Sequence, residues 1–410
     1  MLEPRVLIVG GGAAGLCAAI ASARQGAPVT VLEADARVGR KILASGNGRC
    51  NLTNRAVSPE DYNHPAFVTP VLSEYSGDTV CDFFGSMGLL TAADDEGRVY
   101  PTTNTASSVL DVLRYECTKL NVEIRCGHEA VGISRRESDR GFDVLTRGGY
   151  ILSASAVVVS TGVGTLLESL GHTSIDPVPV LGPLRTGTER IRGLSGVRVR
   201  CSASLIVDAD DDAAGGRVVA TEHGELLFRD YGVSGIMVFD LSRYLEAECV
   251  LSVDLFPAYS NTELGAMLVE RRDALGWRTA ETFCAGMLHD RVARAILRLC
   301  DLRPDTPARE LDLDVMATLL KDFRLPVLGM GDAAQAQVTR GGACVSQFDP
   351  RSMESLCVEG LFAAGEVLDI DGRSGGFNLH WAWASGMTAG QAATRKALSS
   401  AHASRGSGPA

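Results

Sequence analysis

Short apolar runs and a helix-favouring segment open the chain. Residues 5–9 and 28–32 are apolar runs rich in β-branched side chains, and residues 13–25 between them are rich in alanine. Such runs predict buried parallel strands, and the alanine-rich segment predicts a helix that Gly26 ends. The order strand, turn, helix, strand is typical of half of a mononucleotide-binding fold. A further apolar run at residues 156–160 predicts another strand of the same sheet.

The middle of the chain has a different pattern. Strand-like runs separated by turns fill residues 178–257, which predicts a second, β-rich domain. Helical stretches follow, and they open with an S-x-x-E capping box at Ser260 and Glu263. Nearer the C-terminus, residues 361–364 predict a strand and residues 377–398 predict a closing helix. We therefore expect the first domain to be built from both ends of the chain.

These patterns set the expected boundaries. The expected domains are a discontinuous nucleotide-binding domain at 1–178 and 346–400, a β-rich domain at 179–257 and 324–345, a helical insertion at 258–323 and a flexible tail at 401–410. Inside these domains we expect one ordered loop at residues 35–65, and helical stretches at 77–87, 105–120, 279–299 and 312–323.

Composition narrows the possible classes of protein. The 410 residues exceed the usual size of one hydrophobic core, and 45% hydrophobic with 22% charged residues is typical of globular proteins. The net charge of −11 works against broad, nonspecific binding to nucleic-acid phosphates. The 11 cysteines include no C-x-x-C pair, so we expect reduced thiols and no metal site. We expect no signal peptide, no membrane partner and a cytoplasmic location, because no apolar run is long enough to span a bilayer.

A glycine motif lies between the first predicted strand and the first predicted helix. Gly10, Gly12 and Gly15 have the G-x-G-x-x-G spacing. The first glycine permits a tight turn, the second lets the backbone approach a pyrophosphate, and the third lets helix and strand pack closely. Glu33 stands at the end of the second predicted strand, where a carboxylate can accept hydrogen bonds from ribose hydroxyls. In this context the motif predicts a bound dinucleotide.

Further motifs resemble one known family. They are GRKILASGNGRCNLTN at residues 39–54, FRDYGVSG at 228–235, GLFAAGEVLDIDG at 360–372 and GGFNL at 375–379. Over nearly its whole length the chain resembles a bacterial family of NAD(P)/FAD-dependent oxidoreductases, with members similar to aminoacetone oxidases, ketosteroid reductases and ribosomal RNA dihydrouridine synthases. The resemblance implies FAD as the cofactor. It also implies an α/β fold with a Rossmann-like FAD-binding domain of the two-dinucleotide-binding-domain type, an inserted β-barrel-like domain and a small helical excursion.

The resemblance also implies where FAD lies. Gly365 and Glu366 would lie near its ribityl and pyrophosphate groups, and the backbone of Val131 would contact adenine. The first turn of the last helix would offer N–H groups to the flavin N1 edge, which is negatively charged in reduced flavin. Arg40 and Lys41 would face phosphate or ribose, and solvated surface charges are the alternative. With the glycine motif included, the residues expected to bind FAD are Gly10, Gly12, Ala13, Ala14, Gly15, Glu33, Ala34, Arg40, Lys41, Gly48, Arg49, Cys50, Asn51, Val131, Thr161, Gly162, Gly365, Glu366, Gly376, Phe377, Asn378 and Leu379.

Two residues are candidate catalytic proton donors. Cys50 lies in the 39–54 motif, where a thiol could protonate a substrate carbon, although a cysteine in such a loop is more often a small packing residue. Tyr100 precedes Pro101 in a turn and offers a phenol. Solvent is the third possible source of the proton.

The resemblance implies hydride chemistry at the flavin. We expect NAD(P)H to reduce FAD and to bind only transiently, because no second complete G-x-G-x-x-G is present. The reduced flavin would then reduce an activated C=C of a small molecule such as a 3-oxo-Δ4 steroid or bile-acid intermediate. The alternatives are reduction of uridine to dihydrouridine in 23S ribosomal RNA, oxidation of an amine or aminoketone by O2, and a non-catalytic redox sensor. An RNA partner would need a basic face, for which the arginines of residues 185–200 are candidates.

Overall fold

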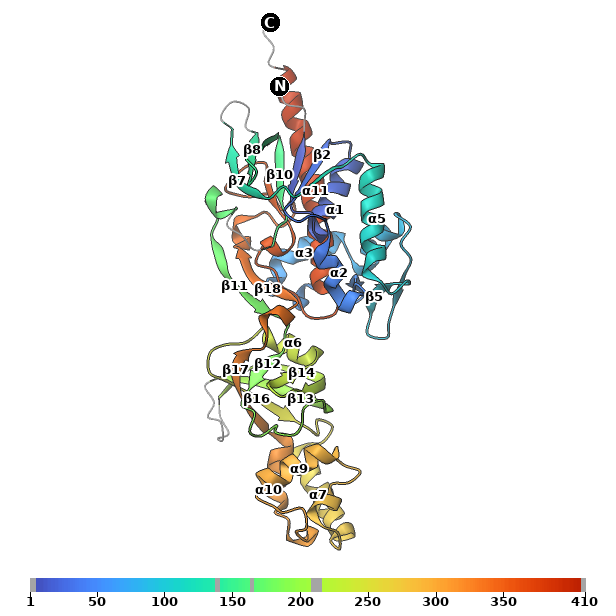
Figure 1. The fold of residues 1–410 in the computed structure, drawn as a ribbon, viewed down its shortest axis with the longest axis vertical. Coiled ribbons are helices and arrows are strands. Elements are labelled where there is room, and N and C mark those ends of the chain that lie inside the picture. Colours follow the sequence, from blue (N-terminus) through green and yellow to red (C-terminus); the bar gives the residue numbers. More distant parts are fainter. Residues whose placement is uncertain (1–4, 137–140, 163–165, 208–215, 407–410) are drawn as a thin grey trace. The chain divides into compact units, whose positions relative to one another are not determined.

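The chain folds into two compact units in a computed structural model that describes the backbone of residues 5–136, 141–162, 166–207 and 216–406. One unit consists of Met1–Val178 with Val338–Ala410, and the other of Pro179–Gln337. The first unit thus contains both ends of the chain, which Figure 1 shows in blue and red. The chain returns to this unit at Val338, earlier than the expected residue 346, because strand β18 (Val338–Ala343) pairs with β11 (Ser174–Val180).

A five-stranded parallel sheet forms the centre of the first unit (Figure 1). Its order is β19 (Leu361–Ala363), β10 (Ala156–Val159), β1 (Val6–Val9), β2 (Val29–Glu33) and β6 (Glu123–Cys126). β1, β10 and β19 are buried throughout, as expected of parallel strands covered on both faces. β2 and β10 both follow β1 in sequence and lie on opposite sides of it. Ligands of open α/β sheets bind at the carboxyl ends of strands at such a reversal of strand order.

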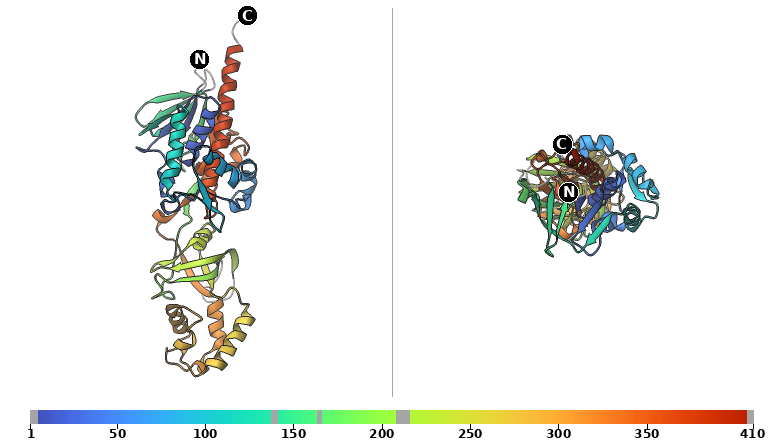
Figure 2. Two further views of the ribbon diagram at one scale, coloured as in Figure 1. Left: turned by 90° about the vertical axis from the view of Figure 1, so that its right-hand side faces the viewer. Right: turned by 90° about the horizontal axis from the view of Figure 1, so that it is seen from above.

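Helices α1 (Ala13–Arg24) and α11 (Phe377–Gly406) join the two ends of the chain. A Cβ added to Gly386 would lie 2.3 Å from the carbonyl oxygen of Ala14, and one added to Gly390 would lie 2.3 Å from that of Ala18. The hydroxyl of Ser22 donates a buried hydrogen bond of 2.8 Å to the carbonyl of Gly390. Small residues thus let the two backbones touch, and the helices run in the same direction. Figure 2 shows the length of α11.

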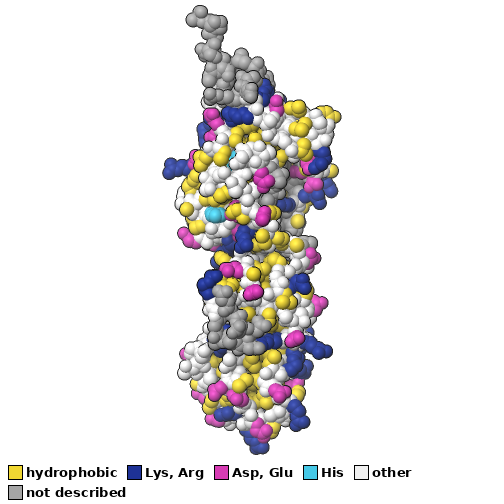
Figure 3. All heavy atoms as spheres, turned by 90° about the vertical axis from the view of Figure 1, so that its left-hand side faces the viewer, with side chains coloured by type: hydrophobic (Ala, Val, Ile, Leu, Met, Phe, Trp, Pro, Cys, Tyr) yellow, Lys and Arg dark blue, Asp and Glu magenta, His cyan; other side chains and the backbone are white. Residues whose placement is uncertain are grey.

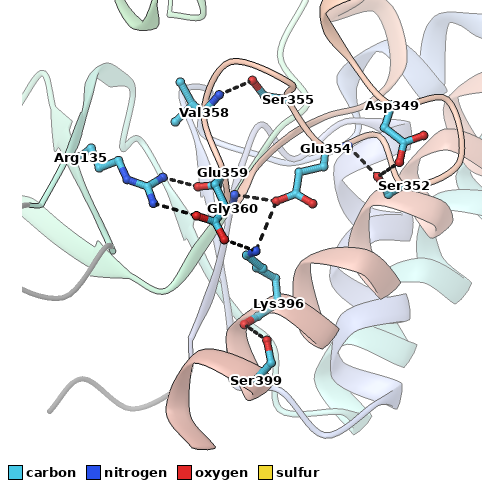
Figure 4. A network of polar contacts seen from close by, with 10 residues as sticks. All are labelled: Arg135, Asp349, Ser352, Glu354, Ser355, Val358, Glu359, Gly360, Lys396 and Ser399. Atoms are coloured by element: carbon cyan, nitrogen blue, oxygen red, sulfur yellow. Dashed lines mark hydrogen bonds and ion pairs between the residues drawn. The ribbon is translucent and has the colours of Figure 1, made fainter. Parts of the chain in front are cut away.

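Smaller elements surround this sheet. They are the helices α2 (Arg40–Ala44), α3 (Pro65–Glu74), α4 (Gly77–Gly85) and α5 (Ala106–Lys119), the sheet of β3 (Thr53–Asn54), β5 (Arg98–Pro101) and β4 (Thr91–Ala93), and the antiparallel sheet of β7 (Ala130–Arg135), β8 (Phe142–Thr146) and β9 (Ile151–Ala154). A polar network ties α11 to β7 (Figure 4). Lys396 Nζ lies 2.5 Å from Glu359 Oε1, and Arg135 donates to the Glu359 carbonyl.

The second unit is a closed β-barrel with helices inserted between two of its strands. The barrel order is β12 (Leu184–Thr186), β15 (Gly232–Ser234), β14 (Arg217–Phe228), β13 (Arg198–Val207), β16 (Cys249–Asp254) and β17 (Phe323–Met330). α6 (Ile236–Ser242) follows β15. Between the paired strands β16 and β17 the chain forms α7 (Asn261–Leu275), α8 (Ala280–Phe283), α9 (Asp290–Leu299) and α10 (Leu313–Lys321). The capping box at Ser260 and Glu263 opens α7 as predicted.

Several elements differ from their predicted extents. Residues 35–65 contain α2 and β3, so they are not one continuous loop, and α3, β4 and β5 had no counterpart in the prediction. The stretch predicted as helical at 279–299 consists of α8 and α9, because Gly286 between them has φ +79°, which is incompatible with a helix. The closing helix continues to Gly406, so the expected tail at 401–410 is helical as far as the structure describes it. Among the described residues, no helix has both the length and the apolarity needed to cross a membrane.

Candidate functional site

The glycine motif forms a turn between β1 and α1. Gly10 has φ +105°, and a Cβ there would lie 2.7 Å from the carbonyl oxygen of Ser160 at the end of β10. A Cβ at Gly15 would lie 1.9 Å from the Gly10 carbonyl oxygen, so the helix can approach the end of the strand only because Gly15 lacks a side chain. A Cβ at Gly12 has no neighbour within 4 Å. Gly12 therefore borders open space at the start of α1, where the first N–H groups of the helix have no intrahelical acceptor.

Glu33 lies beside this turn at the carboxyl end of β2. Its Oε2 accepts a hydrogen bond of 2.8 Å from the Gly11 N–H, and its Oε1 accepts one of 2.8 Å from the Asp35 N–H. Each carboxylate oxygen has a second lone pair available for a donor such as a ribose hydroxyl. The neighbouring Ala34 is exposed, and Arg40 forms an exposed ion pair of 2.8 Å with Asp35.

A second group of predicted residues meets at the ends of β10 and β19. Lys41 Nζ lies 2.6 Å from Glu366 Oε2, which joins the start of α2 to the turn after β19. A Cβ added to Gly162, in the turn after β10, would lie 3.3 Å from the same Lys41 Nζ. Thr161 and Gly162 therefore lie beside this ion pair, although more than a hundred residues separate each of the three segments from the next.

The first turn of α11 lies against the segment that contains β3. Gly376 has φ +101°, and a Cβ there would lie 2.6 Å from the Thr53 carbonyl oxygen and 2.8 Å from Asn51 Oδ1. The Asn378 amide accepts from the Gly372 N–H at 2.8 Å and donates to the Gly372 carbonyl at 2.9 Å, which holds the preceding loop to the helix start. The backbone N–H groups of Phe377, Asn378 and Leu379 belong to the first turn, which has no intrahelical acceptors for them.

Asn51 provides an independent sign of a ligand. Its Oδ1 is buried, and no hydrogen-bond donor reaches it within the described part of the chain. A buried acceptor without a donor costs about 1–3 kcal/mol, so such an atom in a binding loop fits a donor supplied by a bound molecule. The open space at Gly12, the acceptor at Glu33 and this atom together fit a long polar cofactor such as a flavin dinucleotide.

The two candidate proton donors have different surroundings. Cys50 is fully buried in the core with φ +57°, and burial raises its thiol pKa to about 11. The Cys50 side chain has no accessible surface, so it cannot contact FAD or a substrate in this conformation. This burial argues against the catalytic role expected for Cys50. Tyr100 on β5 is half-buried, and the guanidinium of the exposed Arg49 lies 4.8 Å from its ring centroid. Gly48, just before Arg49, is exposed with φ +81°.

Val131 lies at an irregularity of β7. Ala130 pairs with Thr146 and Gly132 pairs with Leu145, so Val131 is an extra residue opposite no partner in β8. Such a bulge leaves backbone groups outside the strand ladder. The exposed Val131 can therefore present its backbone to a ligand, as the predicted adenine contact requires.

Side chains of the last helix support the loop containing β3. His380 Nε2 donates to the Tyr75 carbonyl at 2.9 Å, and its Nδ1 lies 2.7 Å from the Thr53 hydroxyl. Burial lowers the His380 pKa to about 4, so at neutral pH the ring is neutral and Nδ1 accepts from that hydroxyl. Trp383 Nε1 donates to the Leu52 carbonyl at 2.8 Å. The only signal in the sequence was the position of these side chains in the last helix.

Comparison with known proteins agrees with this geometry. The model of the family described as HI0933-like protein Rossmann domain matches residues 4–392. A 3-dehydro-bile acid delta(4,6)-reductase from Clostridium scindens is 33% identical, covering 96% of this chain and 99% of that protein. A ribosomal RNA dihydrouridine synthase from Escherichia coli is 29% identical, covering 94% and 96% of the two chains.

Among solved structures, the 3-ketosteroid-delta4-(5alpha)-dehydrogenase from Rhodococcus jostii RHA1 is 14% identical, with a TM-score of 0.43 over 95% of this chain and 96% of that chain. At that score the likeness adds nothing about activity. The family match and the 33% identity extend over almost the whole chain, and the observed Rossmann-type sheet and closed barrel confirm the predicted fold class. The chain therefore belongs to the HI0933-like family, the flavin-dependent oxidoreductase family that its sequence motifs resemble.

Proposed function

We propose that the protein is an FAD-dependent reductase that uses NAD(P)H to reduce a C=C conjugated to a carbonyl in a small apolar molecule. The observation that carries this proposal is the 33% identity, over 96% of the chain, to a protein named for reduction of a 3-dehydro-bile acid. Bound and reduced, FAD supplies a hydride to the electron-poor carbon of such a substrate. The residues of this chain have to bind and orient the cofactor, exclude water and supply a proton.

The starts of α1 and α11 would each bind a different part of FAD. The start of α1 at Gly12 would hold the pyrophosphate, because the N-terminus of a helix presents free N–H groups and a partial positive charge. Glu33 would accept from the adenosine ribose. The start of α11 would lie at the flavin N1 edge and stabilise negative charge there. The donor that Asn51 Oδ1 lacks would come from the cofactor.

The proton for the substrate α-carbon would come from Tyr100 or from solvent. Of the two side chains considered, only Tyr100 has accessible surface, and the Arg49 guanidinium over its ring would stabilise a phenolate left after proton transfer. A positioned general acid contributes about 10²–10⁴-fold to a rate. Tyr100→Phe should therefore slow substrate-driven reoxidation of reduced FAD by up to that factor while FAD stays bound. An unchanged rate would make solvent the proton source.

Cofactor binding can be tested without disturbing the fold. Since a Cβ at Gly12 meets no atom within 4 Å and its φ is −82°, Gly12→Val fits the protein alone and should fold normally. The same side chain would occupy the pyrophosphate position, so the variant should be colourless, while the wild type should release FAD on denaturation. Gly85→Val is the matched control, because a Cβ there also meets no neighbour. A yellow Gly12→Val protein with a wild-type flavin content contradicts the proposed site.

Turnover distinguishes the reductase from its alternatives. Anaerobic stopped-flow spectroscopy with NADH or NADPH measures reduction of FAD, and a 3-oxo-Δ4 steroid acid added in a second mixing step should reoxidise it. The oxidase alternative predicts instead that O2 reoxidises the flavin rapidly after reduction by an aminoketone, and that the steroid has no effect. A redox sensor would show no turnover with the steroid or with the aminoketone and O2.

One observation favours RNA as a second candidate substrate. Within the second unit, Arg291 of α9 donates to the Ser195 carbonyl at 2.9 Å and Arg298 donates to the carbonyls of Arg190 and Arg192. The predicted basic segment therefore adjoins the arginines of α9. Figure 3 shows acidic side chains among the basic ones on the face in view. If RNA is the substrate, binding of a ribosomal RNA fragment should weaken steeply with salt, and Arg192→Glu should weaken it further.

A further inference from the structure

The loop that precedes the last helix is held by a segment from a distant part of the chain, residues 61–64. The Arg373 N–H donates to the Asp61 carbonyl at 3.1 Å, and the Asn63 N–H donates to the Asp371 carbonyl at 3.1 Å. The Asn63 amide oxygen accepts in turn from the Asp371 N–H at 2.9 Å. Backbone and side-chain hydrogen bonds therefore fix the two segments to each other just ahead of α11.

Tyr62 connects this segment to the first residue of α11. Its side chain is buried, and its hydroxyl donates a hydrogen bond of 2.8 Å to the carbonyl of Phe377. The ring packs against Gly372, where an added Cβ would lie 3.0 Å from Tyr62 Cε1. The Trp381 ring, one turn further along α11, lies 6.4 Å from the Tyr62 ring between centroids. These contacts leave the ring little freedom, so its hydroxyl stays at the Phe377 carbonyl.

The carbonyl that accepts from Tyr62 belongs to the same peptide group as the Asn378 N–H. A peptide group is planar and trans, so a carbonyl oxygen held in one direction holds the N–H in the opposite direction. A hydrogen bond to the carbonyl also polarises the peptide group, which strengthens its N–H as a donor. In the first turn of α11 this N–H has no intrahelical acceptor. Tyr62 therefore acts on an N–H that a ligand can use.

We propose that Tyr62 is a positioning residue for the flavin: it orients and strengthens the Asn378 N–H, which then stabilises the negative charge of reduced FAD. This role rests on the proposed function only in that the N1 edge of FAD has to lie at the start of α11. Reduction of FAD adds negative charge at that edge, so a donor there stabilises the reduced form more than the oxidised form. Removing the Tyr62 hydroxyl should therefore lower the midpoint potential of the bound flavin.

The midpoint potential of FAD in the full-length protein tests this role. Tyr62→Phe keeps the ring and removes the hydrogen bond to the Phe377 carbonyl. The potential, measured by anaerobic reduction alongside a reference dye, should become more negative by up to about 30 mV, which for a two-electron couple is a tenfold change in the preference for reduced flavin. The FAD content should stay as in the wild type, because the start of α1 is unchanged.

Tyr75→Phe is the matched control. The buried Tyr75 hydroxyl is also bonded to α11, where it accepts from Gln391 Nε2 at 2.9 Å. Gln391 lies fourteen residues, or about 21 Å, beyond Phe377 along the helix, so Tyr75→Phe should leave the potential at its wild-type value. An unchanged potential in Tyr62→Phe, or equal shifts in the two variants, would overturn the role of Tyr62 and leave FAD binding intact. A wild-type protein that binds no FAD would overturn both this role and the proposed function.

Discussion

The contact between α1 and α11 lets us predict how Gly386→Ala changes the stability of the first unit. In an exposed helix, replacing glycine with alanine stabilises a protein by about 0.5–1 kcal/mol, because alanine loses less backbone entropy on folding. At Gly386 the added Cβ would lie 2.3 Å from the Ala14 carbonyl oxygen, 3.0 Å from its carbonyl carbon and 3.0 Å from its Cα. All three are backbone atoms of a second helix, so no side-chain rotation can relieve the contact.

The size of the effect follows from this geometry. Restoring an ordinary separation from 2.3 Å requires the helices to move apart by about 1 Å, and such a gap forfeits a quarter to a half of each dispersion contact along the interface. Overpacking of this kind costs about 1–3 kcal/mol, which exceeds the gain in helix propensity. Gly386→Ala should therefore lower the free energy of unfolding of the first unit by about 1–2 kcal/mol and its Tm by several degrees.

The assay can follow the first unit alone. Trp381 and Trp383 are buried on α11, so the change in tryptophan fluorescence during urea unfolding reports this unit, once exposed Trp277 in the second unit is replaced by phenylalanine. Gly85→Ala is the matched control. Gly85 lies in α4 of the same unit, and a Cβ there meets no atom within 4 Å, so this change should be neutral or stabilising. The reasoning fails if Gly386→Ala is as stable as the parent or gains as much as Gly85→Ala.

Three further predictions follow from buried polar groups. At neutral pH iodoacetamide should alkylate exposed Cys357 and leave Cys50 unmodified, as peptide mass spectrometry can show, because burial raises the Cys50 thiol pKa to about 11. Tyr231→Phe should leave thermal stability unchanged or raise it by up to about 1 kcal/mol, since the Tyr231 hydroxyl is buried with no partner among the described residues; a Tm lower by several degrees would contradict this. His380 has a folded-state pKa of about 4, below its unfolded value of about 6.5, so the unfolded state binds more protons between those values. Stability should thus be lost as pH falls from about 6.5 to about 4, by at most about 3 kcal/mol, and His380→Gln should reduce this slope in urea titrations.

Sequence patterns predicted the parallel sheet because its strands are buried on both faces. β1, β10 and β19 are uninterrupted apolar runs. Gly10 follows β1, Ser160 follows β10, and Gly365 follows β19 after one alanine. The glycine motif was informative for the same reason, since strand, turn and helix are contiguous in the chain. Because these elements pack against their neighbours in the chain, a single sequence is enough to predict them.

Other elements depend on contacts that a single sequence does not display. Helix α3 has Pro65 at its first position, where proline is favourable, but also Pro70 in its interior, where proline removes a hydrogen bond. Its buried face, which includes Phe67 and Leu72, packs into the core and outweighs that loss. The pairing of His64 with Asp369 joins residues that are 305 positions apart, and no local pattern marks either partner.

Cys50 shows how a correct motif can still mislead about a residue's role. The 39–54 motif identified the segment that lies beside α11, yet the motif does not say which side chains face the ligand. Among the described residues no donor reaches the buried Asn51 Oδ1, whereas Cys50, the adjacent residue, is enclosed in the core. The chain turns sharply at Cys50, which takes a left-handed conformation with φ +57°.

The close packing of α1 and α11 explains why a cofactor site would require both ends of the chain. Ala14 meets Gly386 and Ala18 meets Gly390, so the helices are parallel and their N-termini point the same way. α11 begins nine residues before Gly386, whereas α1 begins one residue before Ala14, so at 1.5 Å per residue the first turn of α11 lies about 12 Å beyond the start of α1 along the shared axis. Two partial positive charges thus face one edge of the unit at a fixed spacing, one suited to a pyrophosphate and one to a second anionic group. A chain that ended before α11 would keep the glycine motif but lose the second charge and the helix that braces α1.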